Sequence, residues 1–152
     1  MAQNKLQKEI FDYSDDSLRY VNYLQYNSQY QSHFDFFNRF QEQIDNRMLQ
    51  ILFDWIIELH YKFKMRQETL HLTISLVNRI LCEVKISKAQ LQLLGVTTFF
   101  MASKIEEIYP PKIKELVYLT NNAYSKQDVL DFESMVICKL DFNFSVPYSC
   151  FF

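Results

Sequence analysis

The 152-residue chain contains a single glycine, Gly95, and only three prolines. Tight turns between β-strands depend largely on glycine and proline, so this chain has little material for hairpins or sandwiches. Helices joined by short loops need fewer such residues. We therefore predict an all-α protein whose balance of 49% hydrophobic and 22% charged residues is that of an ordinary globular domain.

The charge of the chain argues against nucleic acid as a partner. The net charge is −2, whereas domains that bind nucleic acid usually carry a basic excess. The one basic cluster is "KFKMR" at residues 62–66, which we interpret as a solvated turn between helices.

Cysteine usage and hydropathy predict an intracellular protein of the nucleus or cytoplasm. Cys82, Cys138 and Cys150 are an odd number without close pairing, which is typical of a reducing compartment. The N-terminus lacks an apolar stretch of signal-peptide length. The most apolar run, residues 91–105, is shorter than a membrane span and is interrupted by Gln92 and Lys104, so no membrane contact is expected.

Residue patterns typical of enzymes are missing. The three histidines are not spaced as metal ligands, and one glycine cannot build a phosphate-binding loop. Glu106 and Glu107 are adjacent, hence about 100° apart on a helix, and do not converge on one atom. Cys138 lies in an apolar helical segment and is expected to be a small core residue. We predict neither catalysis, nor a metal, nor a cofactor.

Hydrophobic periodicity predicts about five helices after residue 45. They run from about residue 46 to 63, from the "KFKMRQETL" segment onward, from Ser87, from the Pro110-Pro111 pair, and from about 125 to 140. Ser87 is a suitable N-cap, and prolines are tolerated in a first helical turn. Within residues 1–45, helical spacing of Tyr13, Ser17, Tyr20 and Leu24 predicts one further helix that docks elsewhere, followed by an irregular connection from about residue 33 to 45.

The apolar faces of these helices predict their places in a bundle. The segment from Leu91 is apolar nearly all round and belongs at the centre. The first helix gathers its polar residues in one narrow sector, so it is either central or edged by a second binding surface. The inward sets are expected to be Leu70, Ile74, Val77 and Leu81 in the second helix, and Val129, Phe132, Val136 and Leu140 in the fifth.

Two long stretches of the chain resemble a known family. "ILFDWIIELHYKFKMRQETLHLTISLVNRIL" (51–81) and "LQLLGVTTFFMASKIEEIYPPKIKELVYLTNNAYS" (91–125) are similar to the cyclin box of A- and B-type cyclins. The resemblance is dense over residues 46–147, and "DYSDDSLRY" is more loosely similar to the helix that precedes the box. It implies a five-helix bundle at 46–147, an N-terminal extension with a docking helix at 1–45, and a tail at 148–152 where a second box normally begins.

The family implies a regulatory subunit that binds and activates a cyclin-dependent protein kinase. In similar cyclins the lysine of "ASK" and a glutamate of the fifth helix face the kinase together, and these are Lys104 and Glu133 here. The resemblance adds an apolar rim and two tyrosines of the N-terminal helix to this surface: Ile105, Ile137, Phe144, Tyr13 and Tyr20. Without the resemblance, the residues favour a surface lysine at position 104 that pairs with Glu107 three residues later.

The resemblance also implies a groove for Arg-x-Leu segments of substrates or inhibitors. Its residues are Met48, Ile51, Leu52, Trp55, Leu91 and Gln92, with Glu58 placed to meet the arginine of the peptide. A tryptophan beside a carboxylate suits an arginine. The alternative is that all six are core residues, and for Leu52 both interpretations stand.

The chain departs from the family pattern in two respects. An arginine of the first helix and its acidic partner are replaced by neutral residues, with Asn78 at the acidic position ahead of Arg79; loss of both members of a buried ion pair is compatible with a stable fold. The chain also stops where a second box is expected, which implies a one-box protein, a truncated form or a fragment. A single-box scaffold or adaptor that activates no kinase is therefore the alternative function, and a nucleic-acid-binding relative of the same fold is a third.

Overall fold

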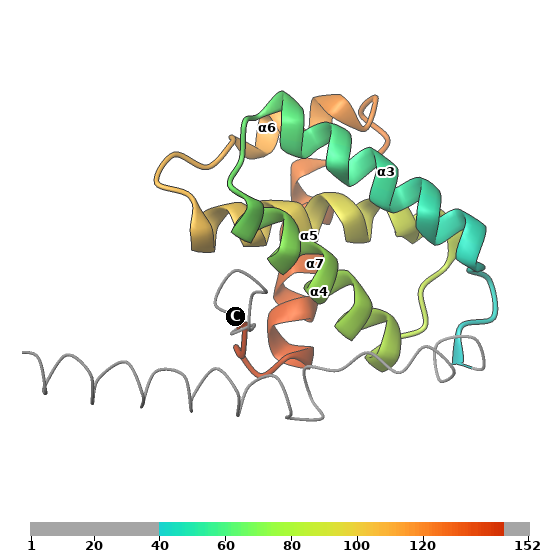
Figure 1. Ribbon diagram of the computed structural model, residues 1–152. Coiled ribbons are helices and arrows are strands. Elements are labelled where there is room, and N and C mark those ends of the chain that lie inside the picture. The colour runs from blue at the N-terminus through green and yellow to red at the C-terminus, as the bar shows by residue number, and fades with distance from the viewer. Residues whose placement is uncertain (1–39, 145–152) are drawn as a thin grey trace, which may run out of the picture. The chain divides into compact units, whose positions relative to one another are not determined.

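The computed structural model describes residues 40–144, and all regular structure in this range is helical. Its five α-helices and one 3-10 turn confirm the predicted fold class (Figure 1). They are α3 (Asn46–Lys62), α4 (Gln67–Glu83), η2 (Lys88–Gln90), α5 (Leu91–Glu106), α6 (Ile113–Leu119) and α7 (Lys126–Lys139). The helix expected within residues 1–45, with Tyr13 and Tyr20, and the tail at 148–152 lie outside the described residues.

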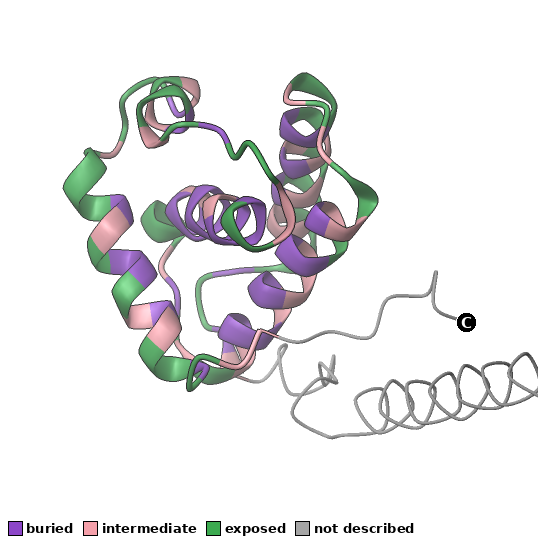
Figure 2. Cartoon of the chain, turned by 90° about the vertical axis from the view of Figure 1, so that its left-hand side faces the viewer, coloured by how far each residue is buried: buried purple, intermediate pink, exposed green. Residues whose placement is uncertain are grey.

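Helix α5 is the centre of the bundle, as its all-round apolar sequence predicted. It contacts each of the other described helices, and in Figure 2 the helix seen end-on at the centre is almost wholly buried. A helix in this position meets neighbours on every side, which is why it lacks a polar face.

The only glycine lies where α3 crosses α5. A Cβ atom built on Gly95 would stand 2.6 Å from Leu52 Cδ1 and 3.6 Å from Cζ3 of Trp55. The backbone of Gly95 has no positive φ, so close approach of α3, and not an unusual conformation, accounts for glycine at this position.

Local signals set most helix boundaries as expected. Ser125 caps α7 by accepting a hydrogen bond from the Asp128 amide, 3.1 Å away. Ser87 begins the third segment as predicted, although its first turn is the 3-10 turn η2 before α5. The prolines do not start α6: the helix begins at Ile113, because the Glu115 carboxylate accepts a hydrogen bond from the Lys112 amide at 3.0 Å and fixes Lys112 as the N-cap.

The inward face of α4 differs from the prediction. Val77 and Leu81 are buried as expected, but Leu70 and Ile74 are only half-buried. Leu72, Leu76 and Ile80 are fully buried instead, together with Thr69 and Thr73. The hydroxyl of Thr73 donates to the Thr69 carbonyl, and that of Thr69 donates to the carboxylate of Glu107, the residue that follows α5. Threonine can be buried in α4 because its hydroxyl is hydrogen-bonded, which a prediction from hydrophobic residues alone does not foresee.

Three further expectations concern α7 and the segment before α3. Val129, Phe132, Val136 and Leu140 are all buried, which confirms the predicted inward face of α7. Cys138 is exposed, so its assignment to the core was wrong: the outward side of α7 carries it. Residues 41–45 contain no helix or strand, as expected of an irregular connection, and the buried side chain of Gln41 bonds the end of α4.

Candidate functional site

An ion pair between Lys104 and Glu133 joins the last turn of α5 to the middle of α7. The Glu133 side chain is 11% exposed, whereas that of Lys104 remains 41% exposed. The Lys104 ammonium also lies 4.3 Å from the centroid of the Phe100 ring, a cation–π distance. Lys104 therefore orients a mostly buried carboxylate while its own donors stay open to solvent on one side.

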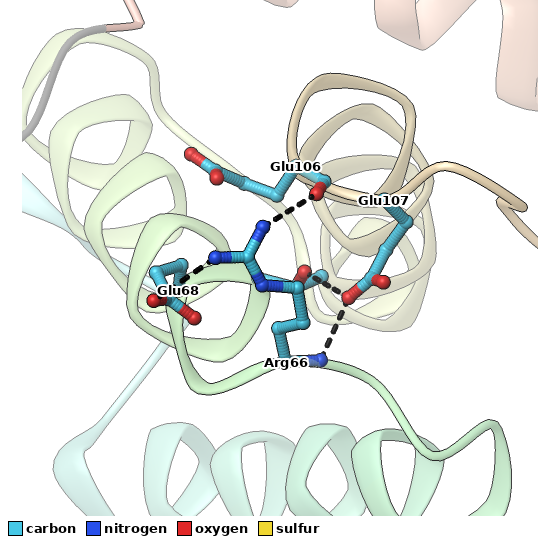
Figure 3. A network of polar contacts seen from close by, with 5 residues as sticks. Arg66, Glu68, Glu106 and Glu107 are labelled. Atoms are coloured by element: carbon cyan, nitrogen blue, oxygen red, sulfur yellow. Dashed lines mark hydrogen bonds and ion pairs between the residues drawn. The ribbon is translucent and has the colours of Figure 1, made fainter.

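The expected pairing of Lys104 with Glu107 does not occur, because Glu107 bonds the start of α4. One carboxylate oxygen of Glu107 accepts hydrogen bonds from the Arg66 amide at 2.7 Å and the Thr69 hydroxyl at 2.5 Å. The Arg66 guanidinium in turn lies 3.2 Å from Glu68 and 3.4 Å from the Glu106 carbonyl (Figure 3). The charged residues at the end of α5 thus bind two different helices: Lys104 pairs with Glu133 of α7, and Glu107 bonds the start of α4.

Apolar residues lie near Lys104 and Glu133 in the sequence. Ile105, next to Lys104, is 48% exposed, and Ile137, one turn after Glu133, is half-buried, as is Phe144. Phe142 was missed at the level of sequence: it is 74% exposed, and its amide bonds the Ile137 carbonyl at 3.2 Å. Its exposure follows from a left-handed turn after α7, where Phe142 has a φ of 57°, and no pattern in the sequence indicates it.

A groove of about 300 Å³ lies between α3 and the start of α5. It is lined by Met48, Ile51, Leu52, Trp55, Lys88, Leu91 and Gln92. The structure thus brings together the six residues that the sequence grouped, and adds Lys88 from η2, which nothing in the resemblance had singled out. Glu58 is exposed on the same helix α3 but does not line the groove.

The lining of this groove is part core and part surface. Ile51 is 61% exposed, whereas Leu52 and Leu91 are buried and still border the open space. Leu52 is therefore a core residue that also lines the groove, since one side of it packs against Gly95 and another faces the open space. An open apolar lining of this kind suits the side chains of an extended peptide.

The fold is a bundle of helices with an open apolar groove on its surface, and comparisons with known proteins identify its family. A family described as "Cyclin, N-terminal domain" matches residues 18–145. The chain therefore belongs to the cyclin family, and the predicted resemblance is confirmed.

Individual relatives are mitotic cyclins. The chain is 42% identical over 106 residues to a G2/mitotic-specific cyclin-B of Spisula solidissima, covering 70% of this chain and 25% of that protein. It is 37% identical over 138 residues to that of Patella vulgata, covering 91% of this chain and 33% of that protein. The chain thus spans about a quarter to a third of the length of these curated relatives.

A solved structure has the same fold. The viral cyclin from herpesvirus saimiri superposes with a TM-score of 0.66 at 22% sequence identity, covering 70% of this chain and 47% of the viral protein. None of the helices within residues 40–144 has the length and hydropathy needed to cross a membrane.

Proposed function

We propose that this chain is a non-catalytic regulatory subunit that binds and activates a cyclin-dependent protein kinase through the surface around Lys104 and Glu133. Membership of the cyclin family supports the class of partner. The observation that carries the proposal is the Lys104–Glu133 pair itself, a preoriented charged group beside the exposed Ile105.

The chemistry of this surface fits a protein interface. Charged groups held in fixed positions give orientation and specificity, while neighbouring apolar area supplies burial. Lys104 can donate hydrogen bonds to backbone carbonyls of a partner without leaving Glu133, because its ammonium has three donors. If this surface binds the active conformation of the kinase more tightly than the inactive one, it shifts the kinase toward activity by that difference in affinity.

The direct test is purification of the tagged chain from its own cells, with a kinase assay on the eluate. Stoichiometric recovery of a cyclin-dependent kinase with activity above background is the expected result. Recovery of a kinase without activity would mean that the chain binds the kinase but does not activate it. Recovery of a different partner without any kinase would support the alternative of a single-box scaffold or adaptor.

We further propose that the groove between α3 and α5 docks Arg-x-Leu segments of substrates or inhibitors, with Glu58 receiving the arginine. Its open apolar lining supports this role, and Ile51 is the most exposed apolar side chain of that lining. We expect Ile51→Ser and Glu58→Ala each to weaken binding of an Arg-x-Leu peptide several-fold, measured by fluorescence polarisation, while the fold is unchanged. Loss in Ile51→Ser but not in Glu58→Ala would assign the arginine to another carboxylate.

The domain boundaries and the location in the cell belong to the same proposal. We assign the cyclin box to residues 46–147, with an extension at 1–45 that contributes Tyr13 and Tyr20 to the kinase surface and a tail at 148–152. We place the protein inside the cell, in the nucleus, the cytoplasm or both, according to where its kinase is found.

A further inference from the structure

A second groove, of about 360 Å³, lies between the C-terminal end of α3 and the short helix α6. It is lined by Lys62, Phe63, Lys114, Glu115, Tyr118 and Leu119. None of these residues belongs to the Lys104–Glu133 surface or to the α3–α5 groove. Figure 1 shows α6 beside that end of α3.

The floor of this groove is apolar and is held by the core. The Phe63 ring packs on the fully buried Phe99, with 6.1 Å between centroids and 41° between planes. A turn after α3 fixes Phe63 from the other side: Lys64 has a φ of 51°, and its amide bonds the Tyr61 carbonyl at 3.2 Å. Tyr118 forms an exposed wall. The groove therefore exists before any ligand arrives, which lowers the entropic cost of binding.

The rim of the groove is positively charged. Lys62 and Lys114 line it from the two helices, and neither side chain has an ion pair or hydrogen bond within residues 40–144. Lys64 and Lys112 are exposed immediately beside them in the chain. Glu115 is the only acidic residue of the lining, and its carboxylate is engaged by the Lys112 amide. A chain of net charge −2 thus places a net positive charge around one apolar groove, since two lysines and one glutamate line it.

We propose that this groove docks a short acidic segment of a partner protein. An aliphatic or aromatic side chain of the segment inserts between Phe63 and Leu119, and flanking carboxylates pair with Lys62 and Lys114. Complementary charge of this kind speeds encounter and selects acidic over basic segments, while the apolar floor supplies most of the contact area. None of the lining residues belongs to the Lys104–Glu133 surface, so, given the kinase binding proposed above, the chain can hold a kinase and an acidic partner together.

The test uses the full chain and a labelled synthetic peptide with a central Leu-Phe pair flanked by two glutamates on each side. Fluorescence polarisation is expected to show saturable binding that weakens as salt is raised, because exposed ion pairs are screened. Lys62→Glu combined with Lys114→Glu is expected to weaken binding by about tenfold or more. Replacing the Leu-Phe pair of the peptide by two alanines should abolish binding.

The matched control is Lys126→Glu combined with Lys139→Glu, two exposed lysines of α7 whose reversal changes the net charge equally. It should bind the peptide as the parent does, and both double variants should still recover the kinase. If both double variants weaken peptide binding equally, the effect is due to net charge and the proposed site is wrong. Absence of saturable binding at millimolar peptide, or unchanged binding of the alanine peptide, would overturn it as well.

Discussion

At the residue scale, a charge swap can separate the structural role of the Lys104–Glu133 pair from its proposed role in kinase recognition. Within the bundle the pair neutralises a carboxylate that is only 11% exposed. Toward a partner it presents a lysine whose donors are partly free. An internal role requires only opposite charges at the two positions, whereas a role in recognition requires the positive charge at position 104.

We therefore predict that the combined variant Lys104→Glu, Glu133→Lys stays folded but loses kinase binding. The intramolecular pair persists with its charges exchanged, while hydrogen bonds from position 104 to the kinase are lost, a cost of roughly 2–5 kcal/mol in binding. Circular dichroism checks the fold, and co-purification checks the kinase. Kinase binding as tight as that of the parent, in a folded variant, would show that the pair is purely structural.

Gly95 is a glycine because α3 passes close to it, which leaves little room for a side chain. An added methyl group would overlap the end of the Leu52 side chain, a flexible group that can shift. Overpacking costs about 1–3 kcal/mol, but alanine recovers about 1 kcal/mol over glycine within a helix. The two effects oppose each other in the free energy of unfolding. We therefore expect the main consequence of this substitution to be a change in the shape of the α3–α5 groove.

For Gly95→Ala we expect a free energy of unfolding about 0–2 kcal/mol lower and a shifted fluorescence emission of Trp55. Trp55 is the only tryptophan of the chain and lies in contact range of the added atom, so the signal has one source. Binding of an Arg-x-Leu peptide should weaken in parallel. Higher stability with unchanged emission would mean that α3 does not press on this position.

At the scale of elements, the start of helix α4 is capped by Glu107, the residue that follows α5. The N-cap residue of α4, Arg66, makes no side-chain capping bond. The carboxylate of Glu107 takes that place by accepting from the Arg66 amide and the Thr69 hydroxyl. A negative charge at the amino end of a helix is also favoured by the helix dipole. Glu107 thus couples the start of α4 to the end of α5.

Glu107→Gln should lower the free energy of unfolding by about 1–2 kcal/mol, because the amide keeps the shape of the cap but loses the charge-assisted bonds. Urea unfolding followed by circular dichroism measures it. Glu83→Gln, at the exposed opposite end of α4, neutralises a glutamate that caps nothing and serves as the matched control. Equal losses in both variants would point to general electrostatics and not to the cap.

At the scale of the whole molecule, Gln41 fastens the segment before α3 to the junction of α4 and α5. Its buried amide nitrogen donates to the carbonyls of Leu81 at 2.6 Å and Val84 at 2.7 Å, and its oxygen accepts from the Ile86 amide at 3.0 Å. One side chain thereby satisfies two carbonyls at the end of α4 and the amide of Ile86 in the segment that follows.

Gln41→Ala should lower the free energy of unfolding by about 3 kcal/mol, because buried backbone groups left without partners are costly. The control is Gln43→Ala, since Gln43 is exposed and bonds only the Lys88 amide at 3.3 Å. Thermal unfolding of both variants, run side by side, measures the difference. A loss in Gln41→Ala no larger than that in the control would show that the segment before α3 is dispensable for stability.

The sequence by itself determined the all-α class, the central place of α5, the inward face of α7 and the family, because these depend on periodicity and on motifs that are local in the chain. It also grouped the residues of the α3–α5 groove, through the resemblance. The resemblance also placed Lys104 and Glu133 together, and the structure shows that they form an ion pair within the bundle. Only the tertiary structure decided that Glu107 caps α4, that threonines are buried in α4, and that lysines of α3 and α6 share a groove. The physical reason is that an ion pair, a distant cap or a shared groove is made by side chains far apart in sequence, and their partners are chosen by how the helices pack.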